Sequence, residues 1–334
     1  MGEKSWMKKV VFFTDLTKFF DALKNFDIDS FSGKSVPIKL HMGEIRNKYF
    51  LKPDLAKLVV DALKSVNAKP YLYDTTVAYP GLRSTKKGYE KVAKIHGFSK
   101  KKVGCDVVID DNGKFVKVEG RNYEVASHII EASHIFGLTH LKGHIQSGMG
   151  GAIKNFGMGC VTKETKRNIH HGSKPVFQKD ACTYCGICAE VCPFEAIKVK
   201  ENSWNISNRK CFGCGVCVDS CETGAIVNKD ENFQYLLSCS AKACVQNKNV
   251  IYLNELKRIA KSCDCDPTKN KIICPDIGYI VSDDIVAIDK ASLDLINNVK
   301  KDIFEKENKV SPMKQIKFGE EIGLGSSSYQ FIEI

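Results

Sequence analysis

The sequence predicts an α/β fold, in which a parallel-sheet, Rossmann-like scaffold is interrupted by a small, cysteine-rich α+β module. Three observations support this prediction. Apolar, β-rich segments alternate with helix-patterned segments before residue 174, a cysteine motif occurs twice between residues 180 and 229, and the alternation resumes after residue 233. We therefore divide the chain into the first part of the scaffold (1–173), the module (174–232) and the second part of the scaffold (233–334).

Strand-like and helix-like segments alternate on both sides of the module. The first part has strand-like segments at 10–15, 35–41, 70–74, 105–110 and 134–144, and helix-patterned segments at 54–67, near 85–96 and near 123–132. The second part continues with a helix from 233, strands at 249–256 and 272–282, and a helix at 284–299. Such alternation is typical of a parallel sheet covered by helices, so we expect one α/β scaffold.

The module is defined by an internal repeat. DACTYCGICAEVCPFEAIKVK (180–200) is echoed by RKCFGCGVCVDSCETGAIVNK (209–229), and each copy contains Cys-x2-Cys-x2-Cys-x3-Cys. This spacing is typical of bacterial ferredoxins with two [4Fe-4S] clusters, in which three cysteines of one run and the fourth of the other hold each cluster. The predicted ligands are Cys182, Cys185, Cys188 and Cys221 for cluster one, and Cys211, Cys214, Cys217 and Cys192 for cluster two.

Two features of the repeat bear on this assignment. Structural zinc is the alternative, but zinc motifs usually split their four ligands into two separated pairs. The first run ends in Cys192-Pro193 as the ferredoxin pattern expects, whereas the second ends in Cys221-Glu222. The missing proline affects the turn after the second run rather than the choice of ligands.

Composition limits the class of protein. No window approaches the roughly 18 apolar residues of a membrane span, and the first residues, MGEKSWMKKVVFFTDL, have too short an apolar run for a signal peptide. The chain has 15 cysteines, which are free to bind metal in a reducing cytoplasm, so we expect a cytoplasmic protein. Its net charge of +11 is scattered over many lysines, which favours acidic partners over nucleic acid.

A glycine-rich segment after residue 144 is the candidate ligand site. In GMGGAIKNFGMG (148–159) we expect Gly148, Gly150 and Gly151 to expose backbone amides to a carboxylate or phosphate, with Lys154 adding a charge. The segment follows a predicted strand, and open α/β sheets bind ligands beyond strand ends. A purely structural glycine loop is the alternative. The nearby His144, His170 and His171 favour a ligand site, whereas we interpret His96, His128, His134 and His140 as packed or surface residues.

The remaining cysteines suggest a further metal site. Cys263 and Cys265 flank Asp264, Cys274 follows nearby, and Cys160 ends the glycine-rich segment. If the fold brings these segments together, three or four thiolates meet beside the ligand site and hold a third cluster or metal with an open position. Unrelated thiols in a reducing compartment are the alternative, and the sequence leaves both interpretations open.

Three segments together resemble iron-sulfur proteins of the domain-of-unknown-function 362 family. They are KGHIQSGMGGAIKNFGMGC (142–160), the cysteine repeat, and SCDCDPTKNKIICPDIGYIVSDDIVAIDKAS (262–292). The resemblance extends from IKLHMGE to the closing GLGSSSYQFIEI and implies an α/β domain with a ferredoxin insertion and no settled reaction.

The spacing of His144 and Lys154 is also remotely similar to a loop of nickel-pincer lactate racemases. That likeness implies that His144 acts on a substrate proton, that Lys154 helps to hold the cofactor, and that His170 or His171 stands at the metal-binding histidine. The chain reads AYPGLRS at 78–84, where that family has a Gly-Thr-His-Arg turn with a second proton-transfer histidine. We therefore do not infer racemase activity for this chain from the likeness.

These observations lead to a preferred functional hypothesis with two alternatives. The preferred one is an iron-sulfur oxidoreductase, a ferredoxin-linked reductase that receives electrons from a redox partner protein. It acts on a small anionic substrate at residues 148–160, where Lys154 binds the anion and His144 supplies a proton. The alternatives are a non-enzymatic electron carrier or maturation factor, and proton-transfer or lyase chemistry on a hydroxy acid with structural clusters. No Gly-x-Gly-x-x-Gly follows a strand to indicate a nicotinamide or flavin.

Overall fold

A computed structural model describes residues 7–266 and 270–334 of the chain. Residues 1–6, where no signal peptide was expected, and residues 267–269, between Cys265 and Cys274, lie outside the described residues. The described residues form an eight-stranded sheet, from edge to edge β16 (Tyr329–Glu333), β1 (Lys8–Phe13), β15 (Gly278–Ser282), β14 (Asn249–Leu256), β7 (His134–His140), β2 (Ser35–Lys39), β3 (Lys69–Thr75) and β4 (Val107–Asp110).

The sheet is mostly parallel, and both parts of the scaffold contribute to it. β14, β7, β2, β3 and β4 pair in parallel, β1 pairs in parallel with β16, and β15 runs antiparallel between β1 and β14. β14 follows the module, yet it pairs with β7, which precedes it. The predicted α/β class with a parallel sheet is therefore confirmed.

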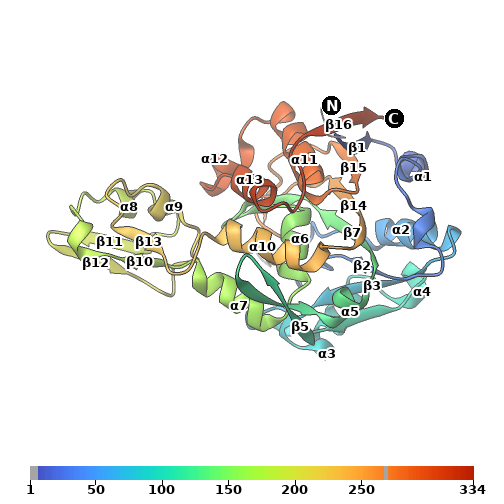
Figure 1. Ribbon diagram of the computed structural model, residues 1–334, viewed down its shortest axis with the longest axis horizontal. Helices are drawn as coiled ribbons and strands as arrows, with labels where there is room; N and C mark the ends of the chain where they lie inside the picture. The colour runs from blue at the N-terminus through green and yellow to red at the C-terminus, as the bar shows by residue number, and fades with distance from the viewer. Residues whose placement is uncertain (1–6, 267–269) are drawn as a thin grey trace.

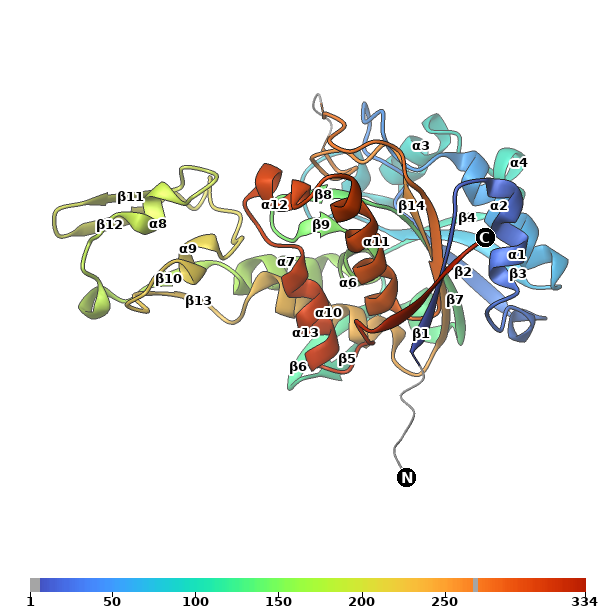
Figure 2. The same cartoon turned by 90° about the horizontal axis from the view of Figure 1, so that it is seen from above.

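Helices cover both faces of the sheet, as Figure 2 shows. Side chains of β14 alternate between two cores, because Val250 and Tyr252 belong to one hydrophobic cluster and Ile251 and Leu253 to the other. The first core is covered by α6 (Ala152–Gly159), α10 (Phe233–Val245), α11 (Ile285–Val299) and α13 (Met313–Glu321). The second is covered by α1 (Phe19–Leu23), α2 (Pro53–Ser65), α3 (Lys86–Ile95) and α4 (Lys100–Val103).

Local sequence explains where the main helices begin. α2 starts with Pro53 at its first position, where the missing N–H costs no helical hydrogen bond. α11 starts after Asp284, whose carboxylate accepts hydrogen bonds from the N–H groups of Val286 and Ala287 at 2.9 Å. Both helices were predicted, at 54–67 and 284–299.

The helix expected near 123–132 was wrong in its first part, because residues 123–126 belong to a strand, and right in its second part. Residues 113–126 form a hairpin of β5 (Gly113–Val118) and β6 (Arg121–Ala126), followed by the short α5 (Ser127–Glu131). Glu119 and Gly120 make the two-residue turn with φ of 47° and 75°, the conformation that suits the twist of a tight hairpin.

Residues 142–172 contain the glycine-rich segment at 148–159, which is regular secondary structure rather than a loop. They form the hairpin β8 (Lys142–His144) and β9 (Gly148–Gly150), followed by α6 and by α7 (Lys163–Gly172). Gly148 alone among the five glycines of 148–159 has a positive φ, of 71°. Gly157 and Gly159 instead lie in α6, where tertiary packing overrides the weak helix propensity of glycine.

The module forms a separate lobe at one end of the molecule in Figure 1. It contains two antiparallel pairs, β10 (Pro175–Phe177) with β13 (Ile226–Asn228) and β11 (Ile197–Lys200) with β12 (Ser203–Ile206). Its short helices α8 (Ile187–Glu190) and α9 (Val216–Asp219) each follow a glycine with positive φ, Gly186 and Gly215. The two copies of the cysteine repeat thus have similar local structures.

Contacts at three places hold the module against the scaffold. The Gln146 side chain donates a hydrogen bond to the Phe212 carbonyl, and Lys314 at α13 forms an ion pair with Asp219. The Asp230 N–H donates a hydrogen bond to the Gly172 carbonyl at 2.8 Å. The contact between Gln146 and Phe212 joins the β8–β9 hairpin to the second cysteine run.

No helix in the described part of the chain has the length and apolar character needed to cross a membrane. The longest of these helices, α11, has 15 residues, whereas a helical span needs roughly 20. The remaining helix, α12 (Ile303–Asn308), is shorter still and packs beside β8 and β9.

Candidate functional site

A cavity of about 410 Å³ lies between the carboxyl ends of the parallel strands and the module. Lys39 ends β2, Asp74 lies at the end of β3, and Lys142 begins the segment directly after β7, and all three line the cavity. Because β7, β2 and β3 are neighbours in the sheet, their carboxyl ends bring these side chains together. Cys211 and Phe212 contribute the opposite wall from the module.

Positive side chains outnumber carboxylates in the lining of this cavity. The carboxylates are Asp74 and Asp264, whereas the cations are Lys39, Arg83, Lys142, Lys154, Lys166 and Lys174. Lys39 Nζ lies 3.0 Å from Asp74 Oδ1, and Arg83 Nη2 lies 3.6 Å from Asp74 Oδ2. Lys154 and Lys166 form no ion pair with any residue in 7–266 or 270–334, so the cavity has an excess of uncompensated cations.

Lys154 projects from α6 into the cavity and has a strongly perturbed titration. Burial lowers its pKa from 10.5 to about 7, the nearby Lys142 acts in the same direction, and Asp264 opposes them. Burial likewise lowers the pKa of Lys166 to about 8, although its ammonium donates to Thr75 Oγ1 and the Thr76 carbonyl at 2.5 Å. An anion placed between these lysines would stabilise their charged forms.

Among the residues that the structure describes, His144 has hydrogen-bond partners at one ring nitrogen, Nδ1, and none at Nε2. Its Nδ1 accepts hydrogen bonds from the N–H groups of Gln146 and Ser147 at 3.2 Å and lies 3.0 Å from Ser147 Oγ. Burial lowers its pKa well below 6.5, and Lys154 and His170 reinforce the shift. Because backbone N–H groups only donate, the neutral ring carries its proton on Nε2 and is a hydrogen-bond donor toward the cavity.

The two adjacent histidines of α7 have different positions. His170 lines the cavity and stacks on Phe233, with ring centroids 5.4 Å apart, and burial lowers its pKa to about 4. His171 is exposed, and its ring nitrogens lie 3.0 and 3.2 Å from Lys229 Nζ. The structure therefore brings His170, but not His171, together with His144 and Lys154.

The glycines of the β9–α6 segment permit close packing around the site. A Cβ at Gly151 would collide with the Asp289 carboxylate, and one at Gly159 would collide with Lys39 Nζ. Asp289 accepts hydrogen bonds from the N–H groups of Ala152 and Ile153 at 2.7 and 2.9 Å. The first amides of α6 thus bind a carboxylate of the protein itself. Gly150 and Gly151 line the cavity, whereas Gly148 packs against the backbone at Val310 and Pro312.

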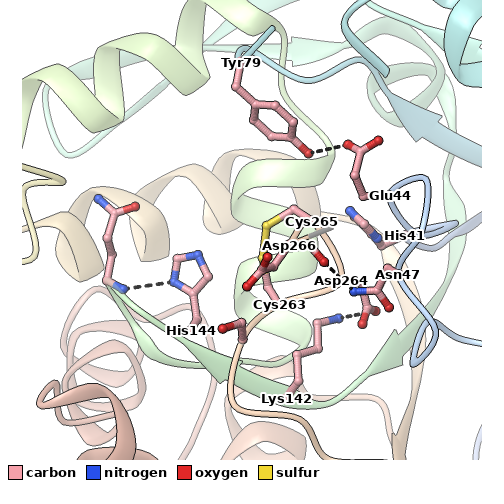
Figure 3. The surroundings of a disulfide bond; sticks show 12 residues. His41, Glu44, Asn47, Tyr79, Lys142, His144, Cys263, Asp264, Cys265 and Asp266 are labelled. Atoms are coloured by element: carbon pink, nitrogen blue, oxygen red, sulfur yellow. Dashed lines mark hydrogen bonds and ion pairs between the residues drawn. A yellow bond between two sulfur atoms is a disulfide. The ribbon is translucent and has the colours of Figure 1, made fainter. Parts of the chain in front are cut away.

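The turn that contains Cys263, Asp264 and Cys265 forms another part of the cavity wall, and the two cysteines are joined as a disulfide (Figure 3). The buried Asp264 carboxylate lies 3.1 Å from His140 Nδ1 and 3.0 Å from Lys142 Nζ. Burial alone would raise the pKa of Asp264, but His140 and Lys142 outweigh it and hold that pKa below 3.8. His140 is buried, as its interpretation as a packed residue expected, and it also lines the cavity, where it holds Asp264.

The other two cysteines assigned to a third metal site do not line this cavity. Cys160 is fully buried in the first core and interacts with Cys244, whose Sγ lies 3.8 Å from the Phe156 carbonyl oxygen. Cys274 is also buried in that core. Cys263 and Cys265 line the cavity as a disulfide, so their sulfurs are not thiolate ligands in this state.

The four cysteines predicted for cluster two share one internal space. A second, small cavity of the module is lined by Cys192, Cys211, Cys214 and Cys217. Burial raises the pKa of the Cys217 thiol to about 12, and the other three cysteines contribute to the shift. Cys211 also lines the large cavity that contains Lys154 and His144, so it forms part of both walls.

The module also has donors suited to sulfur. The N–H groups of Tyr184 and Ala196 donate to Cys182 Sγ and Cys192 Sγ at 3.3 Å, as is common around cluster thiolates. Trp204 Nε1 is buried without a hydrogen-bond partner among the described residues. Burial raises the pKa of Cys188 and the Trp204 N–H opposes this, so the unpaired donor lies beside that sulfur.

Within residues 7–266 and 270–334, no group of three or more His, Cys, Asp or Glu side chains is arranged to hold a single metal ion. A [4Fe-4S] cubane makes a different demand, because each of its four cysteines binds a different iron and the sulfurs surround a larger body. Cys192, Cys211, Cys214 and Cys217 around the small cavity would offer one thiolate for each iron of such a cluster, and the Trp204 N–H lies beside Cys188, an expected ligand of the other one.

Several site residues were missed by sequence reasoning. His41, Lys39, Asp74, Arg83 and Lys166 all line the cavity, yet none belongs to a recognisable motif. His41 follows β2, and burial lowers its pKa well below 6.5, with Arg83 as the next cause. The available signal was that Lys39, His41 and Asp74 are polar residues at or near the ends of the apolar segments 35–41 and 70–74.

Comparison with known proteins identifies a family that covers most of the chain. The family described as domain of unknown function (DUF362) matches residues 36–294, more than three quarters of the sequence. No curated protein matches the chain significantly.

Two solved structures are similar to the fold at low identity. The lactate racemase apoprotein from Thermoanaerobacterium thermosaccharolyticum has a TM-score of 0.38 and 12% identity, and the alignment covers 76% of this chain and 52% of that one. A Thermotoga maritima protein determined by structural genomics has a TM-score of 0.42 and 10% identity, and the alignment covers 91% of this chain and 59% of that one. The chain thus spans a little more than half the length of these proteins.

Proposed function

The chain belongs to the DUF362 family, and within that family we propose that it is an iron-sulfur oxidoreductase that reduces a small anionic substrate. In this proposal the module at 174–232 holds two [4Fe-4S] clusters and receives electrons from a redox partner protein. The substrate binds in the cavity between the module and the strand ends. The observation that carries the proposal is that Cys211, an expected cluster ligand, lines the same cavity as Lys154 and His144.

The charge of the cavity supports an anionic substrate. Lys154 and Lys166 are deeply placed cations without an ion-pair partner among the described residues, and their lowered pKa values reflect the cost of burying them. A carboxylate or other oxyanion would supply the missing opposite charge and strengthen its own binding in these low-dielectric surroundings. A neutral ligand would leave that cost unrelieved.

The arrangement of His144 supports a defined role in the reaction. Its Nε2–H is free while Nδ1 accepts backbone hydrogen bonds, so the ring is suited to donate to a substrate oxygen on which negative charge develops. With a strongly lowered pKa the ring acts as a neutral donor. Lys154, with a pKa of about 7, is the better group to exchange a proton near neutral pH.

The clusters, when bound, would supply single electrons at low potential. The chain's own contribution is to hold Cys211 at the cavity wall through the contact between Gln146 and Phe212, and to enclose the substrate between the module and α6. His144 and Gln146 lie on the same hairpin segment, so the donor and the docking contact are fixed together.

The proposal is tested by reoxidation of the reduced protein under anaerobic conditions. Protein reduced with dithionite and freed of excess reductant is mixed with single small carboxylates and oxyanions, while cluster absorption near 400 nm is followed. We expect one chemical class of anion to reoxidise the clusters, and Lys154→Met to slow that reaction at least about tenfold, because a charged hydrogen bond is lost. Lys117→Met, which changes an exposed lysine of β5, is the matched control.

Two results would contradict the proposal. If no anion accelerates reoxidation while a redox protein does, the chain is an electron carrier and its cavity is not catalytic. If an anion binds in the cavity and exchanges a carbon-bound proton with solvent without cluster reoxidation, the chain performs proton-transfer chemistry and its clusters are structural.

A further inference from the structure

We propose that the Cys263–Cys265 disulfide is a redox centre of the cavity, which collects two electrons from the module and returns them as an electron pair to the bound substrate. The inference rests on the proposed electron supply by the module. It deepens that function by assigning an electron acceptor within the chain itself, in the wall of the cavity that Cys211 and Lys154 also line.

The disulfide lies in the wall of the cavity. Cys263 and Cys265 line the cavity together with Cys211 and Phe212 from the module and Lys154 from α6. A disulfide that served only to staple the chain would join distant segments, because its effect grows with the length of the loop that it closes. This one joins residues only two positions apart and therefore constrains very little of the unfolded chain.

The surrounding turn is anchored independently of the S–S bond. The Asp264 carbonyl accepts a hydrogen bond from the Glu44 N–H at 2.9 Å, and the Asp266 carbonyl accepts one from Asn47 Nδ2 at 2.9 Å. The Asp264 carboxylate is held by His140 and Lys142. Breaking the disulfide therefore leaves the backbone in place and keeps the two sulfurs adjacent for reoxidation.

The chemical step balances in electrons and atoms. The S–S bond of Cys263 and Cys265 breaks as it accepts two electrons, which come from two successive one-electron oxidations of the reduced iron-sulfur module. Two protons from solvent complete the two thiols. In the return step, the dithiol gives two electrons and two protons to an oxidised anionic substrate, and the disulfide forms again.

A disulfide in the cavity would link a donor of single electrons to a substrate that accepts electrons in pairs. Iron-sulfur clusters transfer single electrons, whereas most small organic substrates accept electrons in pairs. Lys142 Nζ lies 3.0 Å from the carboxylate of Asp264, the residue between the two cysteines, and Lys154 lines the same cavity as the disulfide, so an anionic substrate bound there would lie in the cavity that also contains the sulfurs. The cavity thus holds a two-electron reductant beside its anion site.

The test counts thiols before and after cluster reduction. Anaerobically purified protein is reduced with a photochemically generated one-electron donor and quenched with acid. It is then denatured and alkylated with iodoacetamide, and the mass of the peptide containing Cys263 and Cys265 is measured by mass spectrometry. We expect neither cysteine to be alkylated before reduction and both to be alkylated afterwards, a gain of two labels. Paramagnetic resonance on the same sample reports reduction of the clusters separately.

Two variants isolate the route of the electrons. Cys214→Ser, which removes an expected ligand of cluster two, should keep the disulfide intact under the same illumination while a phosphine still reduces it. Cys263→Ser should retain the cluster spectra and lose the gain of labels. The inference would be overturned by free thiols in the unreduced wild type, or by a disulfide that persists after both clusters of the wild type are reduced. Equal reduction in the wild type and Cys214→Ser would also overturn it.

These outcomes are distinguishable from failure of the proposed function. If the clusters are absent, the resonance spectrum shows it before any thiol is counted. If an anion reoxidises reduced clusters equally fast in the wild type and in Cys263→Ser, the reductase function stands and the disulfide relay is wrong.

Discussion

Cys211 and Lys154 line the same cavity, although one belongs to the second cysteine run of the module and the other to α6 of the scaffold. Cys211 also lines the small cavity shared with Cys192, Cys214 and Cys217. An expected cluster ligand therefore separates the space suited to a cluster from the space suited to an anion.

The first prediction concerns metal content. Anaerobically purified protein should contain about eight iron and eight sulfide per chain, as expected for two [4Fe-4S] clusters. Replacing Cys185 and Cys214 together by serine should remove most of this iron, because each cluster loses one ligand. Cys105→Ser, which changes a buried cysteine of the second core, is the control and should retain it. Full iron retention in the double variant would refute the ligand assignment.

The second prediction concerns the pH dependence of anion binding. The pKa of Lys154 is lowered to about 7, so its ammonium is charged below that pH and is lost as the pH rises through it. Anion affinity measured by calorimetry should therefore be high at pH 6 and fall between about pH 7 and 8, the latter being near the pKa of Lys166. Lys154→Met should weaken binding at pH 6 by about tenfold or more and remove the step near pH 7. An unchanged profile in this variant would assign the anion to another group.

The third prediction concerns the protonation of His144. Because burial lowers its pKa well below 6.5 and Nδ1 accepts from two backbone N–H groups, the ring should remain neutral at pH 6 with its proton on Nε2. Nitrogen-15 NMR of histidine-labelled, oxidised protein can identify this tautomer, with His144→Gln supplying the assignment. A proton on Nδ1, or titration near pH 6.5, would contradict the assigned donor role.

The fourth prediction concerns packing of α6. A Cβ at Gly157 would collide with the Leu237 backbone, whereas one at Gly150 would meet the flexible side chains of Lys154 at 3.2 Å and Lys142 at 3.7 Å. Gly157→Ala should destabilise the protein by about 1–3 kcal/mol and lower its thermal midpoint, even though alanine favours a helix. Gly150→Ala is the matched control and should unfold close to the wild type. Equal thermal midpoints for Gly157→Ala and the wild type would show that α6 and α10 have room for a Cβ between Gly157 and Leu237.

Much of the scaffold could be predicted from the sequence because its strands are apolar and bounded by helix-patterned segments. β1, β2, β3, β4, β7 and β14 lie where the apolar runs predicted them. α6 could not be predicted, because its glycines are poor helix formers and their value lies in contacts with α10 and Lys39. The β5–β6 hairpin was missed because its strands are short and half-exposed, so their pattern did not separate from that of a helix.

The candidate site was predicted only in part. His144, Lys154 and His170 were identified because they stand near one another in the sequence, and all three line the cavity. Lys39 and Asp74 were missed because their meeting depends on the order of strands in the sheet, which no local pattern contains. His171 was a candidate by adjacency to His170, but successive residues of a helix point in different directions, and it is exposed.

The central claim is that electrons held by the module reach a ligand in the cavity, and the most direct test is the position of the iron. Crystals grown anaerobically with a bound anion should be measured at the iron absorption edge. We expect two compact iron sites inside the module, one bounded by Cys192, Cys211, Cys214 and Cys217 at the cavity wall, with the anion beside Lys154. A signal at the zinc edge instead, or iron sites with Cys211 left unligated and facing away from the anion, would contradict the account.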